Sequence, residues 1–424
     1  MTGDRDPEQP EVDPHPWRAA VVLGLLAIVG GMAASMWIAP ALGHNHWWIP
    51  GDAWRSLRAA HYVPQGTYPL IYETGTLRDV FDSGPLLPLV LAPVAALGDL
   101  LHLRDSYPFP RQHPSMWLAF GPYALASAVP LMYAVRALAT QLRIRTGLLF
   151  LQIAVLLFAF VPMAIVYGHY EDVLALALVL LAFRDLFADR PLRGALLVAV
   201  AIAFKQWSLL AVPVYVAACA PELRRRAAVR TLVPPALFFC AFLVADFKYA
   251  SFALLHPPAF PLYGHAALWV SPTTDYIADV PTRVGAFAVA FVVAWLIRRE
   301  RDPGVVLSAL GIVLLARFFF EPVVHSYYLA PGLAVLLVAA RSVRARIVTD
   351  VALGAVLLAL FPFHPARLLW WLAVYALGAA FVSRPVLLLV RRVRTGAGRR
   401  PSRSAGAPGP DDRAPEPSLS GAPA

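Results

Sequence analysis

The chain has 424 residues, of which 59% are hydrophobic and 15% charged, and its formal net charge is +10. A soluble domain usually carries about 25% charged residues, so the composition excludes an ordinary soluble domain. The arginines lie in short clusters between apolar runs, which is typical of loops that set membrane orientation and not of a nucleic-acid surface.

Long uncharged runs define the fold class. Ala19–Met36, Leu148–Val166 and Val284–Leu296 contain no charged residue. A membrane span needs about 20 mostly apolar residues, and its backbone groups must pair within the segment. These runs lack the alternation of polar and apolar residues that a β-barrel strand requires. The sequence therefore predicts an all-α polytopic membrane protein.

Both ends of the chain differ in composition from the part between them. Residues 1–16 and 396–424 are rich in proline, glycine, serine and charge, which predicts disordered tails. Residues 17–395 form one integral membrane domain. We expect no cleavable signal peptide, because the first apolar run follows an acidic, proline-rich leader.

Six arginine clusters predict the topology. The positive-inside rule places all of them in the cytoplasm, so two crossings must separate each successive pair. The clusters are Arg136 with Arg143 and Arg145; Arg184 with Arg190 and Arg193; Arg224, Arg225, Arg226 and Arg230; Arg298, Arg299 and Arg301; Arg341, Arg344 and Arg346; and the run from Arg391.

This parity decides two ambiguous stretches. Leu192–Ala220 must be two short helices, Leu192–Phe204 and Trp207–Cys219, with Lys205 at an outward-facing junction. Each helix is about 20 Å long, which is short for a bilayer. Leu86–Leu101 cannot be a span, so we expect a helix that lies on the outer face or dips into it.

The resulting prediction is about twelve transmembrane helices in the inner (plasma) membrane, with both termini in the cytoplasm and a long first extracytoplasmic loop over residues 44–114. The expected spans are Arg18–Ala39, Ser115–Leu138, Leu148–Tyr167, Val173–Phe187, the two short helices, Leu232–Asp246, Val284–Ile297, Val305–Phe320, Leu329–Ala340, Val351–Phe363 and Leu368–Val382.

With this topology, the unusual polar residues fall on the outer side. Ionisable groups at membrane depth are expensive and indicate functional sites. Lys205, Arg317 and Glu321 carry most weight, because they interrupt otherwise apolar sequence. The candidate site residues are Asp52, Asp82, His169, Glu171, Asp172, Lys205, Gln206, Arg317 and His325.

Five short motifs occur in the order found in the GT-C glycosyltransferases, and the chain resembles that superfamily over roughly residues 18–385. They are Gly51-Asp52, Phe81–Leu86, Gly168–Asp172, Phe204–Gln206 and Val324-His325. The similarity is to glucosyltransferases that use dolichyl-phosphate glucose and to bacterial polyprenyl-phosphate mannosyltransferases. Ser326 and Tyr327 stand where that family has Glu-Lys.

The resemblance implies an inverting transfer of a monosaccharide, with mannose as one candidate, from a polyprenyl-phosphate donor to an extracytoplasmic glycolipid, glycan or protein. Asp52 would be the general base. Lys205, Arg317 and His325 would bind the donor phosphate. Asp82, His169, Glu171, Asp172 and Gln206 would bind the sugar or the acceptor. The reaction requires no cofactor, although the acids at 171 and 172 leave room for a divalent metal.

Structural alternatives stand beside these roles. Asp52 could cap a helix N-terminus, and Lys205 could snorkel from a helix end. Glu171 and Asp172 could serve only to favour the start of the next helix. The alternative function is a multi-pass lipid or sugar carrier or flippase, against which the lack of internal repeats argues.

Overall fold

The computed structural model describes residues 16–41, 49–73, 81, 83–103, 115–144, 149, 152–153, 156, 163–164, 168–255, 279–320, 326–340 and 390–391. The described residues form helices and the turns between them, and they contain no strand. The α-helical part of the predicted fold class is therefore confirmed.

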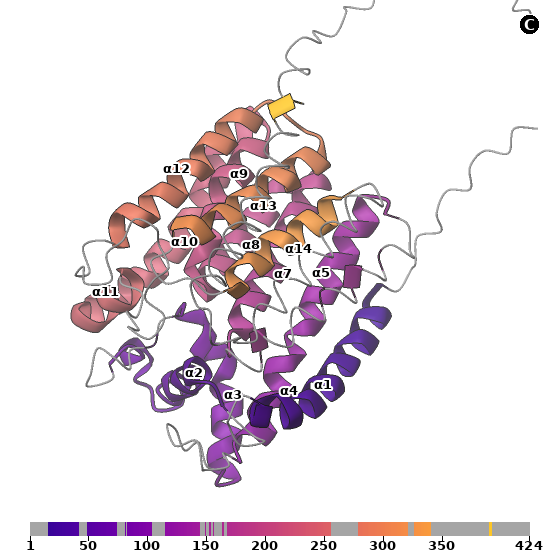
Figure 1. The fold of residues 1–424 in the computed structure, drawn as a ribbon. Helices are drawn as coiled ribbons and strands as arrows, with labels where there is room; N and C mark the ends of the chain where they lie inside the picture. The colour runs from indigo at the N-terminus through magenta and orange to yellow at the C-terminus, as the bar shows by residue number, and fades with distance from the viewer. Residues whose placement is uncertain are drawn as a thin grey trace, which may run out of the picture.

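The described chain begins with the helix α1 of 26 residues and continues through helices of 8 to 22 residues (Figure 1). The α-helices are α1 (Pro16–Ala41), α2 (Gly51–His61), α3 (Leu86–Leu100), α4 (Trp117–Ala126), α5 (Ala128–Gln141), α7 (Tyr170–Phe187), α8 (Pro191–Phe204), α9 (Ala211–Ala218), α10 (Arg224–Ala245), α11 (Phe247–Leu255), α12 (Asp279–Ile297), α13 (Pro303–Phe320) and α14 (Ala330–Ala339). Four 3₁₀ turns join them: η1 (Tyr68–Leu70), η4 (Gln206–Leu210), η5 (Pro221–Leu223) and η8 (Ser326–Leu329).

Three helical segments in the described part of the chain are long and apolar enough to cross a membrane: Ala20–Trp37, Trp117–Gln141 and Pro221–Ala245. The first and third are mostly exposed, as lipid-facing helices must be. The other apolar helical segments in this part of the chain have 10–17 residues. The expected spans Val351–Phe363 and Leu368–Val382 lie outside the described residues, and most of Leu148–Tyr167 does too.

The predicted interruption at Lys205 is confirmed. α8 ends at Phe204, and Lys205 adopts an extended backbone with φ −149° and ψ 126°. The chain then continues through η4 into α9. The Lys205 N–H still donates to the Ala201 carbonyl of α8, while the Lys205 side chain reaches Glu171 on α7.

The helix over the predicted outer-face stretch is confirmed as α3, which packs against α2 at one end of the molecule (Figure 1). A second expectation was wrong in part. Arg224 and the two arginines after it were assigned to a loop, but they form the first turn of α10. Arginine is a good helix former, so a cluster of arginines does not by itself end a helix.

Four packed helices of the described chain build the core that positions the site. α7 packs against α5 and α8, and α8 packs in turn against α10. The start of α7 and the end of α8 therefore lie at the same end of this group. Figure 1 shows α2 and α3 below that end.

Candidate functional site

Two glycines allow separate segments to approach the start of α7. Gly168 has φ +74°, which favours glycine, and a Cβ there would lie 2.8 Å from the Ala53 Cβ of α2. Gly84 donates its N–H to the Phe204 carbonyl at 2.9 Å, and a Cβ there would overlap the Ala203 carbonyl. These contacts bring α2 and the 83–85 turn against α7 and α8.

Asp52 lies in the first turn of α2 and does not cap it. Pro50 occupies the N-cap position, and no side chain caps the helix. The Asp52 carboxylate instead accepts a hydrogen bond from Arg55 Nη1 at 2.6 Å and lies 3.0 Å from His169 Nε2. The N-cap alternative is therefore wrong. About a third of the Asp52 side chain stays exposed (30%), so a ligand can reach it.

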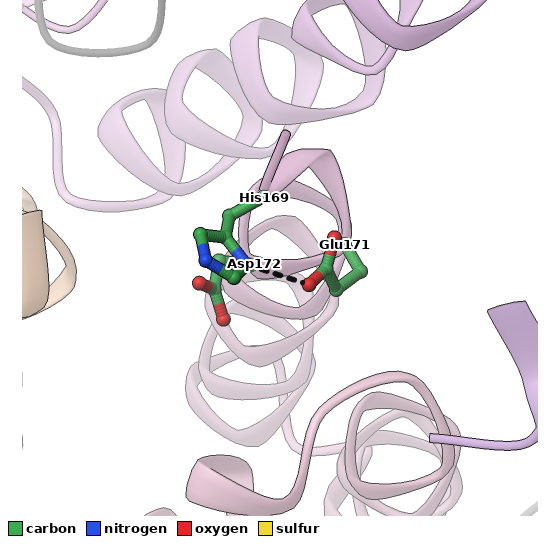
Figure 2. A group of neighbouring side chains, drawn as sticks. All are labelled: His169, Glu171 and Asp172. Atoms are coloured by element: carbon green, nitrogen blue, oxygen red, sulfur yellow. Dashed lines mark hydrogen bonds and ion pairs between the residues drawn. The ribbon is translucent and has the colours of Figure 1, made fainter. Parts of the chain in front are cut away.

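His169 lies between two carboxylates. Its Nε2 faces Asp52 Oδ2 at 3.0 Å, and its Nδ1 faces Glu171 Oε1 at 2.9 Å (the second contact is dashed in Figure 2). Ionised carboxylates only accept hydrogen bonds, so both ring nitrogens must carry hydrogens. His169 is therefore an imidazolium that joins the two acids.

The pKa values of the two partners agree with this charge state. Burial lowers the pKa of His169, but the Glu171 charge and the hydrogen bonds to both acids outweigh burial and raise the pKa to about 10. Burial raises the pKa of Asp52, but the hydrogen bond from His169 and the charges of His169, Arg55 and Lys205 hold it well below its usual range. Both groups are thus charged at neutral pH.

Lys205 continues the network into the protein. Its ammonium group donates to Glu171 Oε1 at 2.9 Å and to Ser83 Oγ at 3.0 Å, and Ser83 Oγ donates to Glu171 Oε1 at 3.0 Å. Glu171 is almost completely buried, at 1% exposure. Lys205 is buried as well, so the snorkelling alternative is wrong. A buried ion pair of this kind needs its partners, because removing one leaves a charge uncompensated.

The charges alternate along the network. Arg55, Asp52, His169, Glu171 and Lys205 form a continuous line of positive and negative groups. Asp172 lies beside this line, and its Oδ1 accepts a 2.6 Å hydrogen bond from Trp207 Nε1 of η4. With Asp172 included, three cations face three carboxylates, so the network is electrically balanced.

Two polar atoms at the site have no hydrogen-bond partner among the described residues. They are Glu171 Oε2 and Gln206 Nε2, and both are buried. Buried polar groups are nearly always hydrogen-bonded, so such atoms indicate a bound polar ligand or water. One is an acceptor and the other a donor, which suits hydroxyl groups.

The site can also be examined as a metal centre. His169, Glu171 and Asp172 offer ligand atoms within 4.8 Å of one another (Figure 2). The donors are already engaged, however. Both nitrogens of His169 face carboxylates, and the Lys205 ammonium lies 2.9 Å from Glu171 Oε1. A divalent cation bound to Glu171 would be repelled by the positive charge of the Lys205 ammonium, and one of the two would have to leave. The arrangement therefore does not fit a metal.

The other predicted residues lie elsewhere or outside the description. Arg317 is in the last turn of α13, with its guanidinium 4.3 Å from the centre of the Tyr328 ring. Asp82 and His325 lie outside the described residues.

Three residues of the network, Arg55, Ser83 and Trp207, were not predicted from the sequence as site residues. Arg55 follows Asp52 by three residues on α2, and that spacing was a usable signal for an ion pair.

The first testable consequence concerns pH. The pKa of His169 is raised above its ordinary value of 6.5, so its contribution to stability is complete below pH 6.5 and is lost as pH rises through 10. We expect the thermal stability advantage of wild type over His169→Gln to shrink steadily across this range. Thermal unfolding in detergent from pH 6 to 10.5 measures it. An advantage that stays constant would contradict the imidazolium assignment.

Comparison with known proteins leaves the family open. No protein-family model matches the chain, and a search of curated proteins finds no significant match. The case for a function therefore rests on the geometry of the site.

Proposed function

We propose that the protein is a membrane glycosyltransferase of the GT-C type. It moves a monosaccharide from a polyprenyl-phosphate donor to an acceptor on the outer side of the inner membrane, with inversion. One observation carries the proposal. Four separate motif segments that resemble those enzymes meet in a single buried network, through Asp52, Ser83, His169 with Glu171, and Lys205.

Asp52 is the proposed general base. The acceptor oxygen forms a bond to C1 of the sugar, the bond from C1 to the phosphate oxygen breaks with its electron pair, and the acceptor proton passes to Asp52. Because the pKa of Asp52 is low, it is a weak base that is always ionised. Proton transfer then occurs late, when the acceptor oxygen has already become acidic through bonding to C1.

The leaving phosphate needs more positive charge than the network offers. Lys205 contributes positive charge on the phosphate side, but Glu171 already offsets that charge. We assign the additional charge to Arg317, at the end of α13, and to His325. Such fixed cations stabilise the developing phosphate charge in a site that excludes water.

The sugar and acceptor hydroxyls are assigned to the remaining polar groups. Glu171 Oε2 accepts and Gln206 Nε2 donates, and both lack a partner among the described residues. Asp82, His169 and Asp172 complete the proposed set. The proposed reaction uses no metal or other cofactor, because Arg317 and His325 are assigned the charge at the leaving phosphate.

A panel of donors tests the proposed activity. Purified protein is incubated with labelled polyprenyl-phosphate sugars and a mixture of membrane glycolipids and glycans. We expect label from one donor to move to an acceptor or to water, while the Asp52→Asn variant releases far less. Uptake of the labelled lipid into vesicles without cleavage would instead favour a carrier.

The orientation is a separate prediction. We propose a multi-pass topology with both termini in the cytoplasm and α2 with α3 outside. Gln65 and Arg225 are both exposed, on opposite sides in this topology. Cysteine at Gln65 should react with a membrane-impermeant thiol reagent in intact cells, and cysteine at Arg225 should react only after lysis. The reverse pattern would overturn the placement of the site.

A further inference from the structure

A second charged cluster lies at the opposite end of α7 from the candidate site. Asp185 is almost completely buried, at 1% exposure. Arg193 Nε lies 3.0 Å from its Oδ2, while Arg184 Nη1 and Arg190 Nη2 lie 3.3 Å and 3.8 Å from its Oδ1. Three guanidinium groups therefore converge on one carboxylate at the α7–α8 turn.

α10 adds a fourth guanidinium. Arg230 Nη1 donates to the Leu192 carbonyl at the start of α8, at 3.5 Å. Even with the exposed Asp189 of the same turn, four guanidiniums face two carboxylates, so the cluster keeps a surplus of positive charge. Arg190 and Arg193 remain 47% and 63% exposed, so their free N–H groups can reach a ligand.

Exposed apolar side chains continue from these arginines along both helices. On α8, Leu196 and Val200 follow Arg193 by three and seven residues, and both are exposed. On α10, Val233 and Leu237 stand in the same relation to Arg230 and are exposed as well. Residues at this spacing share one helix face. α8 and α10 pack together, and Arg230 contacts the start of α8, so both apolar rows begin at the arginine cluster.

We propose that this basic cluster and the two apolar rows bind one anionic phospholipid. The headgroup phosphate lies against Arg190, Arg193 and Arg230, and the acyl chains lie along the apolar rows of α8 and α10. Guanidinium groups suit this role because their planar N–H pairs match phosphate oxygens. Asp185 holds the arginines in a fixed arrangement. The proposal requires membrane embedding but not the glycosyltransferase activity.

A purely structural role for the arginine cluster explains only part of its arrangement. The ion pair between Asp185 and Arg193 Nε stabilises the α7–α8 turn without a ligand. Stabilising the turn does not require two further arginines there. It also does not require an exposed arginine on α10 at the start of a second apolar row. Arg225 and Arg299, which are also exposed, provide a control of equal charge. Arg225 lies five residues from Arg230, on a different face of α10, and Arg299 follows the end of α12.

The test compares lipids of equal chain length and different headgroup. Full-length protein in neutral detergent is titrated with phosphatidylglycerol, phosphatidylcholine or inorganic phosphate. Thermal unfolding and native mass spectrometry of retained lipid are the readouts. We expect selective retention of phosphatidylglycerol and a selective rise in Tm. Arg193→Gln combined with Arg230→Gln should weaken phosphatidylglycerol binding by about tenfold. Arg225→Gln combined with Arg299→Gln should leave it unchanged.

Several outcomes would overturn the proposal. Equal loss in the two double variants would show a diffuse charge effect. Equal stabilisation by inorganic phosphate would show a free-anion site, and equal retention of phosphatidylcholine would show no headgroup selection. If the glutamine double variant fails to fold, Arg193→Lys with Arg230→Lys keeps the charge but loses the paired N–H groups. It should bind phosphatidylglycerol more weakly than wild type, and wild-type affinity in it would also contradict the proposal.

Discussion

Asp52→Asn should express and fold normally but transfer sugar about 10²–10⁴ times more slowly than wild type, the usual contribution of a general base. The amide keeps the shape of the carboxylate, and its oxygen can still accept from Arg55, which now lies 2.6 Å from Asp52 Oδ1. The change removes the capacity to take a proton together with one negative charge, and the 30% exposure of this side chain lets water screen the lost charge. Transfer rates under donor saturation and thermal stability are the two measurements.

Asp99→Asn is the matched control for this variant. Asp99 is a carboxylate on α3 at the same end of the molecule, and it pairs with His61 at 3.1 Å outside the network. We expect it to transfer at the wild-type rate. Asp52→Asn with near-wild-type turnover would remove Asp52 from the chemistry and favour a carrier.

Lys205→Met should abolish detectable donor binding and destabilise the fold. The change leaves Glu171 buried at 1% exposure without the ammonium 2.9 Å away, and breaking a buried pair in this way costs about 3–5 kcal/mol. Lys205→Arg keeps the charge and should retain part of the binding. Binding of a labelled polyprenyl-phosphate sugar and thermal unfolding separate the two effects.

A double variant keeps this prediction testable if Lys205→Met unfolds. Adding Glu171→Gln removes the uncompensated charge, so stability should recover while donor binding stays lost. Lys248→Met, at the only other lysine in the chain, is the matched control and should bind donor normally. Normal donor binding by the folded double variant would contradict a phosphate contact at Lys205.

The helix boundaries around the site followed from the sequence. The parity of the arginine clusters required an interruption near Lys205, and α8 does end at Phe204. The same parity predicted a helix that is not a span from Leu86, and the structure has the helix α3 there, packed on α2. Such features depend on hydrophobic pattern and charge, which are local properties of the sequence.

The contacts inside the site could not be predicted in the same way. The N-cap alternative for Asp52 and the snorkelling alternative for Lys205 were both consistent with local sequence, and the contacts with His169 and Glu171 show both to be wrong. These contacts span more than 30 residues. They depend on the close approaches of other segments to Gly84 and Gly168. The sequence around each glycine does not show which distant segment lies against it.

The length of α7 between its two buried acids can be compared with the thickness of a bilayer. Glu171 and Asp185, each 1% exposed, lie at its two ends, and 14 residues of helix separate them by about 21 Å. The hydrocarbon layer of a bilayer is about 30 Å thick. These two acids are therefore closer together than the two headgroup layers. Under the proposed function, a lipid-linked sugar at Lys205 would lie with its phosphate below the neighbouring headgroups and would leave part of its hydration shell behind.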